Sequence, residues 1–267
     1  MVAPYNSLHG RGRVLSAINV LGVGISPITM TMALDQIDQW VSRRDRQYVC
    51  VCTVATIMNC RRAEDLRQIV NRAGMRTPDG MPLVWLAHLR GHREVTRVYG
   101  PDLMLAVMAR SAARGYRHYL YGGGPGIAQR LARVMTGRFP GVSVVGAQSP
   151  PFAPLEELCT PDAAAAINGP NPDIVWVGIG NPKQERWMAR MRPQLLAPVL
   201  IGVGAAFDFH TGQKPQAPRW MQRGGMEWLF RLFHEPRRLG RRYLVDNPWF
   251  LYEAALQTLG LKHFELP

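Results

Sequence analysis

The sequence predicts an α/β fold, in which helices flank a Rossmann-like parallel sheet and a helical appendage follows at the C-terminus. The first observation is a βαβ unit, because apolar strands at 116–121 and 142–148 are separated by a glycine loop and a helix at 127–138. Consecutive parallel strands need such a crossover connection. The second observation is that helices and strands alternate again between residues 161 and 203. The third is a change to arginine- and aromatic-rich sequence from Lys214 onward.

Apolar runs and helical periodicity place the remaining elements. Before the βαβ unit we predict strands at 14–23 and 48–53 and helices at 29–43, 57–73, 82–89 and 101–114. After it we predict helices at 161–167 and 183–191, strands at 173–178 and 199–203, and appendage helices at 219–233, 239–243 and 249–261. The predicted organisation is a flexible N-terminus (1–13), an α/β core (14–213) and the appendage (214–267).

Composition limits the classes of protein to which the chain can belong. With 267 residues, 47% of them hydrophobic, the chain can bury a substantial core. A formal charge of +13 indicates an acidic partner, which is a nucleic acid, a phosphorylated substrate or an anionic membrane. No apolar run approaches the roughly 18 to 20 residues of a membrane span, and the N-terminus lacks a signal-peptide core, so we expect a cytoplasmic protein. The four cysteines favour buried thiols over a disulfide framework or a metal site.

The appendage carries much of the excess charge. Residues 214–242 hold eight Lys and Arg residues against two Glu, a net charge of +6. These charges alternate with Trp, Met, Leu and Phe, a pattern typical of an amphipathic helix at a membrane surface. Each basic residue near an anionic leaflet contributes about 1 kcal/mol, so several together hold a protein there reversibly. The alternative, a solvated face over an apolar stripe, explains only part of this imbalance.

Asp79 is the first candidate for catalysis. Acidic residues are scarce, with 19 Asp and Glu against 32 Lys and Arg, and Asp79 lies in Thr-Pro-Asp-Gly-Met-Pro, where a turn leads into a helix. A carboxylate at the end of a rigid element can face a cleft and serve as a general base. From this context alone, the favoured interpretation of Asp79 is the N-cap of the following helix, and the rest of the chain decides between the two.

Other candidates follow predicted strands, at the edge where open α/β sheets bind ligands. Gly122, Gly123 and Gly124 can bring backbone amides close to a phosphate, or form only a tight turn. Asn181 and Gln184 can hydrogen-bond a sugar or a base, and Lys183 can neutralise a phosphate; alternatively, these residues form a cap and a solvated first helical turn.

The next predicted strand is followed by a second candidate carboxylate, Asp208. His210 is a weaker candidate, since a lone histidine beside aromatic residues is more often structural. No Asp-x-Asp pair occurs in the chain, so the sequence predicts a metal-independent site without a cofactor. In such a site Arg, Lys and helix dipoles would stabilise a departing diphosphate.

Several of these segments occur together, in order, in one known family. The motifs are Thr-Pro-Asp-Gly-Met-Pro-Leu-Val-Trp (77–85), Arg-Val-Tyr-Gly-Pro-Asp-Leu-Met (97–104), Tyr-Gly-Gly-Gly-Pro-Gly (121–126), Gly-Asn-Pro-Lys-Gln-Glu (180–185), Gly-Val-Gly-Ala-Ala-Phe-Asp-Phe (202–209) and Ala-Pro-Arg-Trp-Met-Gln-Arg (217–223), which runs on to Glu-Pro-Arg-Arg (235–238). Over roughly residues 14–261 the chain resembles the WecG/TagA/CpsF glycosyltransferases, classed as glycosyltransferase family 26.

The resemblance implies a fold, a reaction and a site. It implies a Rossmann-like core with a membrane-targeting appendage, and inverting transfer of a sugar, N-acetylmannosamine-like or a related hexose, from a UDP-sugar to a polyprenyl-diphosphate-linked saccharide at the inner leaflet of the membrane. Asp79 would be the base and Gln184 would lie in the active site. Appendage arginines would contact the lipid diphosphate, and the candidates are Arg219, Arg223, Arg231, Arg237 and Arg238. The sequence leaves open whether the chain forms homo-oligomers.

The chain departs from the family at one point. Many members carry Thr-x-Asn after the strand that precedes the first long helix, and both residues line the pocket. This chain has Cys-Thr-Val-Ala-Thr at 52–56, so the Asn is absent, and Thr53 or Thr56 would have to replace its contact. The rival hypothesis is a non-catalytic basic module that binds nucleic acid or phosphate; ordered polar motifs at successive strand ends argue against it, because backbone-phosphate binding does not need them.

Overall fold

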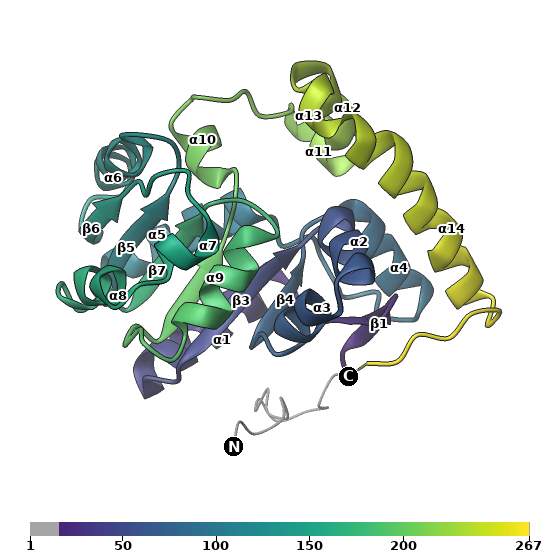
Figure 1. Ribbon diagram of the computed structural model, residues 1–267, viewed down its shortest axis with the longest axis horizontal. Helices are drawn as coiled ribbons and strands as arrows, with labels where there is room; N and C mark the ends of the chain where they lie inside the picture. The colour runs from purple at the N-terminus through teal and green to yellow at the C-terminus, as the bar shows by residue number, and fades with distance from the viewer. Residues whose placement is uncertain (1–15, 267) are drawn as a thin grey trace.

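A six-stranded parallel sheet forms the centre of the molecule (Figure 1). The computed structural model describes residues 16–266, so the predicted flexible N-terminus (1–13) lies outside the described residues. The strand order is β4-β3-β8-β7-β5-β6. These strands are β3 (Gln47–Cys52), β4 (Met75–Pro78), β5 (Arg117–Gly122), β6 (Ser143–Gln148), β7 (Ile174–Gly178) and β8 (Val199–Gly202). The α/β fold class predicted from the sequence is confirmed.

Helices cover both faces of the sheet, because alternate strand residues point to opposite sides. In β3, Cys50 and Cys52 join one hydrophobic core, while Val49 and Val51 join the other. The first core lies under α2 (Val54–Arg62), α3 (Glu64–Asn71), α4 (Met81–Leu89), α7 (Leu155–Leu158), α8 (Pro161–Asn168) and α9 (Lys183–Met191). The second lies under α1 (Met30–Arg43), α5 (Gly100–Arg114), α6 (Ile127–Arg138) and α10 (Ala206–His210). The four cysteines are free thiols; Cys50, Cys52 and Cys60 are buried as predicted, whereas Cys159 is partly exposed.

Three predicted elements are interrupted in the structure. The strand expected at 14–23 is a hairpin of β1 (Ile18–Val20) and β2 (Val23–Ile25), because Leu21 and Gly22 turn the chain at positive φ. The helix expected at 57–73 begins earlier and divides at Ala63, which has extended backbone geometry. The helix expected at 219–233 divides at Gly224–Met226.

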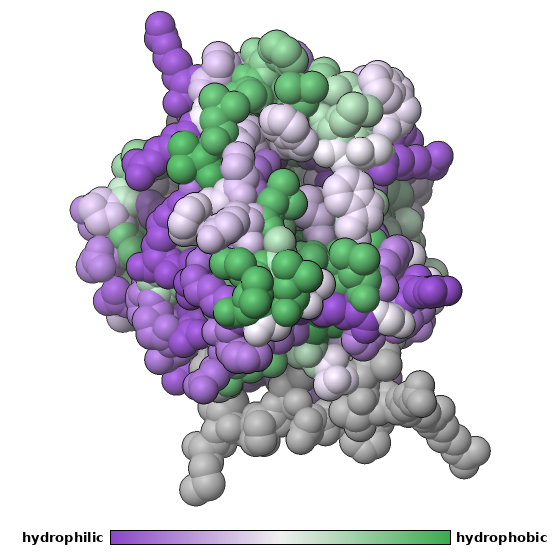
Figure 2. Space-filling view, turned by 90° about the vertical axis from the view of Figure 1, so that its right-hand side faces the viewer, coloured by the Kyte–Doolittle hydropathy of each residue, from purple (hydrophilic) through white to green (hydrophobic). Residues whose placement is uncertain are grey.

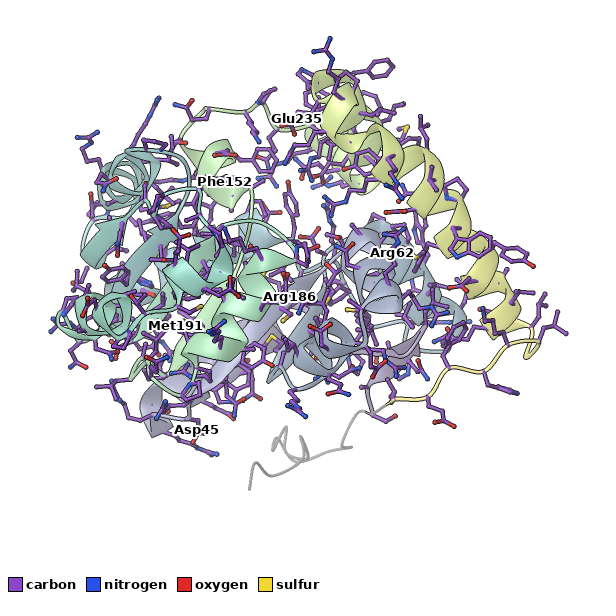
Figure 3. All side chains as sticks on the ribbon, in the orientation of Figure 1. Asp45, Arg62, Phe152, Arg186, Met191 and Glu235 are labelled. Carbon is purple, nitrogen blue, oxygen red and sulfur yellow. The ribbon has the colours of Figure 1, made fainter. Side chains whose placement is uncertain are left out.

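The appendage forms a helical arm that packs back onto the core. Its elements are α11 (Arg219–Arg223), α12 (Glu227–His234), α13 (Pro236–Arg241), the π-helical turn η1 (Arg242–Asp246) and α14 (Asn247–Thr258). Phe250 of α14 is buried in the first core. Glu253 accepts a hydrogen bond from Arg61 of α2 at 3.0 Å, and Arg62, labelled in Figure 3, pairs with Asp246.

The outer face of the arm is unusually apolar. Trp249, Leu251 and Tyr252 of α14 are all more than half exposed, and Leu244 and Val245 extend the same surface. Figure 2 shows this side of the molecule, where hydrophobic side chains gather over the region of the arm. Exposed apolar patches of this kind mark surfaces that bind proteins or membranes. None of the helices within residues 16–266 has the length and apolar character of a membrane span.

Candidate active site

Asp79 lies at the carboxyl edge of the sheet, directly after β4. In the parallel pair of β3 and β4, Pro78 lies opposite Cys52, and the Asp79 N–H donates to the Cys52 carbonyl at 2.9 Å. The register therefore places Asp79 beside Thr53, the first residue after β3. Ligands of open α/β sheets bind at this edge.

The Asp79 carboxylate does not cap the helix that follows it, so that alternative is wrong. Gly80 is the N-cap of α4 and makes no side-chain cap. Instead, Asp79 Oδ2 accepts the backbone N–H of Gly100, the first residue of α5, at 3.2 Å. Asp79 Oδ1 lies 3.5 Å from Nη2 of Arg97, whose Nε donates to the Asp79 carbonyl. The carboxylate is thus held by the N-terminus of a different helix and by one arginine.

Burial gives Asp79 the proton affinity of a useful base. Only 8% of the residue is exposed, and this burial raises the pKa of Asp79 to about 6 from an ordinary value of 3.8. Arg97 opposes the rise in pKa, and Glu227 adds to it. A carboxylate with such a pKa is mostly ionised at neutral pH, yet it binds a proton more readily than an ordinary aspartate does.

A cavity of about 100 Å³ is lined by Asp79 and by both parts of the chain. Thr53 lines it directly after β3, Ala55 from the first turn of α2, and Asp79 and Gly80 from the end of β4. The core also contributes Met81, Pro82 and Arg97. The appendage completes the wall with residues that include Glu227, Trp228, Arg231, Arg242 and Tyr243. The core alone therefore does not form this cavity.

Two arginines of the cavity have no ion pair in the part of the chain that the structure describes. Within residues 16–266, neither Arg231 nor Arg242 forms an ion pair with a carboxylate. Arg231 lies over the ring of Phe209, 5.7 Å from its centroid, and Arg242 Nη2 is 3.5 Å from Thr53 Oγ1. Burial lowers the pKa of Arg242, which means that its charged form is under-solvated. Paired guanidinium groups in this setting favour an anionic ligand such as a diphosphate.

A second polar cluster lies beside the cavity, at the N-terminus of α9. Asn181 donates to Glu185 Oε1 at 2.8 Å and to Thr56 Oγ1 at 3.3 Å, and it accepts from Asn59 at 2.7 Å. Gln184 and Glu185 are buried, and burial raises the pKa of Glu185. Gln184 Oε1 and Glu185 Oε2 have no hydrogen-bond partner among the described residues. Buried acceptors without a partner are rare inside proteins, and neither Gln184 nor Glu185 lines the cavity.

The glycine loop between β5 and α6 is close-packed. Gly122 and Gly123 have positive φ, and a Cβ on Gly122 would lie 2.5 Å from the backbone of Gly178. The Gly123 N–H donates to the Gly178 carbonyl at 3.0 Å, so this amide is not free to bind a phosphate. Gly124 is exposed to solvent. Lys183 donates to the carbonyl of Ala153 and lies over the Phe152 ring, 5.2 Å from its centroid. In this arrangement the loop and Lys183 lie outside the cavity lining.

The two candidates after β8 have partners of their own. Asp208 forms an ion pair with Lys214 at 3.2 Å, and Lys214 also contacts Glu235 of the appendage at 3.0 Å. His210 Nε2 lies 3.1 Å from the carbonyl of Pro101, and burial lowers the pKa of His210. His210 therefore has the structural surroundings expected of a core histidine.

The five predicted diphosphate-binding arginines are not all close to the cavity. Arg231 lines it, whereas Arg219, Arg223, Arg237 and Arg238 are exposed on the appendage, and Arg238 pairs with Glu235. The cationic side chain that accompanies Arg231 in the cavity is Arg242.

Comparison with known families identifies the class of protein. The Glycosyl transferase WecG/TagA/CpsF family matches residues 18–263 of the 267. The chain belongs to this family. It is accordingly a glycosyltransferase, with a sugar donor and an acceptor as substrates.

The departure from the Thr-x-Asn motif of WecG/TagA/CpsF members can be located in the structure. Thr53 and Thr56 form a reciprocal capping box at the start of α2, with their Oγ1 atoms 3.3 Å apart. Thr53 and Ala55 line the cavity, and Thr56 contacts Asn181. Both hydroxyl groups therefore hold local structure, and at Ala55 the cavity wall presents a methyl group.

Sequence reasoning missed the cavity roles of Arg97, Glu227 and Arg242. Arg97 begins the motif at 97–104, but nothing in its sequence context distinguishes it from a surface arginine. In the sequence, Glu227 is one of two acidic residues in a basic segment, and its position alone does not assign it a role. The available signal was the scarcity of acids, since a lone Glu within an amphipathic basic segment suggests a specific partner.

Proposed function

We propose that this protein transfers a sugar from a UDP-sugar to a polyprenyl-diphosphate-linked saccharide, with inversion at the anomeric carbon, and that Asp79 is the general base. One observation carries the proposal. A buried carboxylate with a pKa of about 6 shares a cavity with two arginines, neither of which has an acidic partner among the described residues. Family membership supports transferase chemistry over the rival reading of a basic module that binds nucleic acid.

In the proposed reaction, the acceptor hydroxyl lies next to Asp79 and attacks the anomeric carbon from the face opposite the UDP. The bond from the anomeric carbon to the acceptor oxygen forms as the bond to the diphosphate oxygen breaks, and the hydroxyl proton passes to Asp79. A positioned base of this kind contributes about 10² to 10⁴-fold to the rate. The single displacement inverts the anomeric configuration.

The arginines provide the counter-charge for diphosphate groups. Arg231 and Arg242 would contact the lipid diphosphate or the departing UDP without the help of a metal ion. The donor would extend along the carboxyl edge of the sheet toward the glycine turn (Gly122–Gly124), Lys183 and Asp208. The buried acceptor atoms of Gln184 and Glu185 are suited to sugar hydroxyls. Because this chain lacks the pocket Asn of many family members, the identity of the sugar has to be determined by experiment.

The appendage would bring the site to the inner leaflet of the membrane, in a pathway that makes cell-surface or exopolysaccharide. Its apolar outer face supports this proposal, as do the exposed charges of Arg219, Arg223, Arg237 and Arg238. Each such charge would add about 1 kcal/mol of attraction to an anionic surface.

The test is to incubate the protein with a panel of UDP-sugars and a short-chain polyprenyl-diphosphate saccharide, and to measure UDP release and product. Asp79→Asn is the base variant, and Asp102→Asn, which changes an aspartate in the first turn of α5 that does not line the cavity, is the matched control. We expect one donor to give product whose anomeric configuration, read by NMR, is opposite to that of the donor. Loss of turnover in Asp79→Asn but not in Asp102→Asn would support the base role. Retention of configuration, or near-normal turnover of Asp79→Asn, would refute it.

A further inference from the structure

Arg97 lies between two carboxylates that come from different parts of the chain. Its Nη2 is 2.5 Å from Glu227 Oε2 on α12 and 3.5 Å from Asp79 Oδ1 after β4. The three side chains are each at most 16% exposed. The shorter and stronger contact is with the appendage residue.

The Glu227 carboxylate is held in place from two sides. Tyr99 donates its hydroxyl proton to Glu227 Oε1 at 3.0 Å, while Arg97 occupies Oε2. The guanidinium of Arg97 also lies over the Tyr99 ring, 4.0 Å from its centroid, which restrains it further. Gln216 Nε2 is 3.3 Å from the same hydroxyl oxygen. Arg97 Nε also donates to the main-chain carbonyl of Asp79, so the guanidinium is anchored beside the base. Glu227 and Tyr99 then direct its Nη2 away from the Asp79 carboxylate, which it approaches only to 3.5 Å, longer than a good ion pair.

We propose that Glu227 is a positioning residue for the base: it holds Arg97 away from the Asp79 carboxylate, and it does so only while the appendage is docked on the core. The inference rests on the proposed role of Asp79. Because Glu227 lies on α12, the docking that completes the cavity would also set the strength of the base. An enzyme with its appendage released would then have an Asp79 neutralised by Arg97 and poorly suited to accept a proton.

The charges around Asp79 agree with this direction. The Gly100 N–H, Arg97 and Arg231 favour the ionised carboxylate, whereas burial and the charge of Glu227 favour the protonated form. Arg242 lines the same cavity as Asp79, and the Tyr99 hydroxyl donates to Glu227. Removing the charge of Glu227 takes away a repulsion and also frees Arg97 to approach Asp79. Both changes lower the pKa of Asp79.

The experiment compares Glu227→Gln with Glu235→Gln. The glutamine at 227 keeps the size of the side chain and can still accept from Tyr99. Glu235 is the matched control, because it also joins the appendage to the core, through Lys214, but does not line the cavity. Two quantities are measured for each protein. The first is the titration midpoint of the Asp79 carboxyl carbon, by ¹³C NMR of aspartate-labelled protein and assigned with Asp79→Asn. The second is the pH dependence of turnover with the donor that the UDP-sugar panel selects and the same short-chain acceptor.

In the wild-type protein about one tenth of Asp79 is ionised at pH 5, since its pKa is about 6. We expect Glu227→Gln to lower the midpoint and to raise turnover at pH 5, relative to turnover at pH 8, by about threefold or more and at most about tenfold. Turnover at pH 8 should fall, because a weaker base accepts the proton less readily. Arg97→Gln should move the midpoint in the opposite direction. Glu235→Gln should leave both readouts unchanged.

An unchanged Asp79 midpoint in Glu227→Gln would overturn the inference while leaving the base assignment intact. A fall in turnover by the same factor at both pH values, with the midpoint unmoved, would indicate a structural role only and would overturn it as well. Full activity of Asp79→Asn would instead overturn the proposed function, and with it the positioning role, whatever the titration showed.

Discussion

Replacement of Asp79 by Asn is expected to abolish most of the activity and, at the same time, to stabilise the fold. The folded-state pKa of about 6 exceeds the ordinary value of 3.8, so the folded protein binds the Asp79 proton more tightly than the unfolded chain does. The favourable contribution of this group is present below about pH 4 and is lost as the pH rises through 6. At pH 8 the wild-type protein therefore carries the full penalty of a buried, ionised carboxylate.

The magnitude follows from the shift of about two pKa units. At about 1.4 kcal/mol per unit, the ionised carboxylate lowers the free energy of unfolding by about 3 kcal/mol at pH 8. The carboxamide of Asn carries no charge, and its oxygen can still accept the Gly100 N–H. Asp79→Asn should thus raise the melting temperature at pH 8 by up to about 6 to 12 °C, at 2 to 4 °C per kcal/mol for a chain of this size. At pH 4 the difference should nearly vanish.

The assay is calorimetry or fluorescence-monitored melting of both proteins from pH 4 to pH 8, with Asp79→Ala as a contrast. Alanine also removes the charge, but it leaves the buried Gly100 N–H without an acceptor, which costs about 1 to 3 kcal/mol. Asn should therefore be more stable than Ala at every pH. An Asp79→Asn protein less stable than wild type at pH 8, or a difference independent of pH, would show that Asp79 is not a destabilised carboxylate.

Further predictions follow from the same site. Turnover should fall as the pH drops through about 6, because Asp79 becomes protonated, and a pH–rate profile of the wild-type protein measures this acidic limb. Arg231→Met and Arg242→Met should each weaken inhibition by UDP by about tenfold or more, whereas Arg237→Met, an exposed appendage change, should not; competition assays with a soluble acceptor compare them. Trp249→Ser should reduce sedimentation with anionic vesicles but leave turnover of that soluble acceptor unchanged. Chelation of divalent cations by EDTA should leave the rate unaltered, which a direct assay of UDP release tests.

The elements that the sequence predicted best are those whose ends are marked by glycine or proline residues. The βαβ unit of β5, α6 and β6 was recognised because glycines separate a clear strand from a clear helix. In contrast, β4 was missed, because it is only four residues long and contains Arg76, a residue type that normally marks the surface. Arg76 is buried because its guanidinium donates to the carbonyls of Asn71 and Ala73 at 2.8 and 2.7 Å. Those partners are not apparent from local sequence.

Prediction of the site was limited because local sequence does not show which distant residues come into contact in the fold. The place of Asp79 in a turn that leads into a helix could be inferred from the sequence, but the strand before it and its contact with Gly100 could not, because that contact depends on where α5 packs. Only one of the five chosen arginines, Arg231, lines the cavity, since helix phase and the break at Gly224–Met226 decide which side chains turn inward. The contribution of Arg242 depends on the irregular π-helical turn that begins at this residue, which no periodicity rule anticipates.

The charges in the cavity suggest why catalysis and acceptor delivery belong to one element. Asp79 and Glu227 bring two negative charges, and Arg97, Arg231 and Arg242 bring three positive ones. Arg97 is occupied by the two carboxylates, so the surplus charge lies on arginines supplied by the appendage. A diphosphate would neutralise that surplus and thereby favour the docked arrangement, in which Glu227 also restrains Arg97. Under the proposed function, binding of an anionic acceptor and tuning of the base would be coupled, because both depend on side chains presented by α12 and the turn that follows α13.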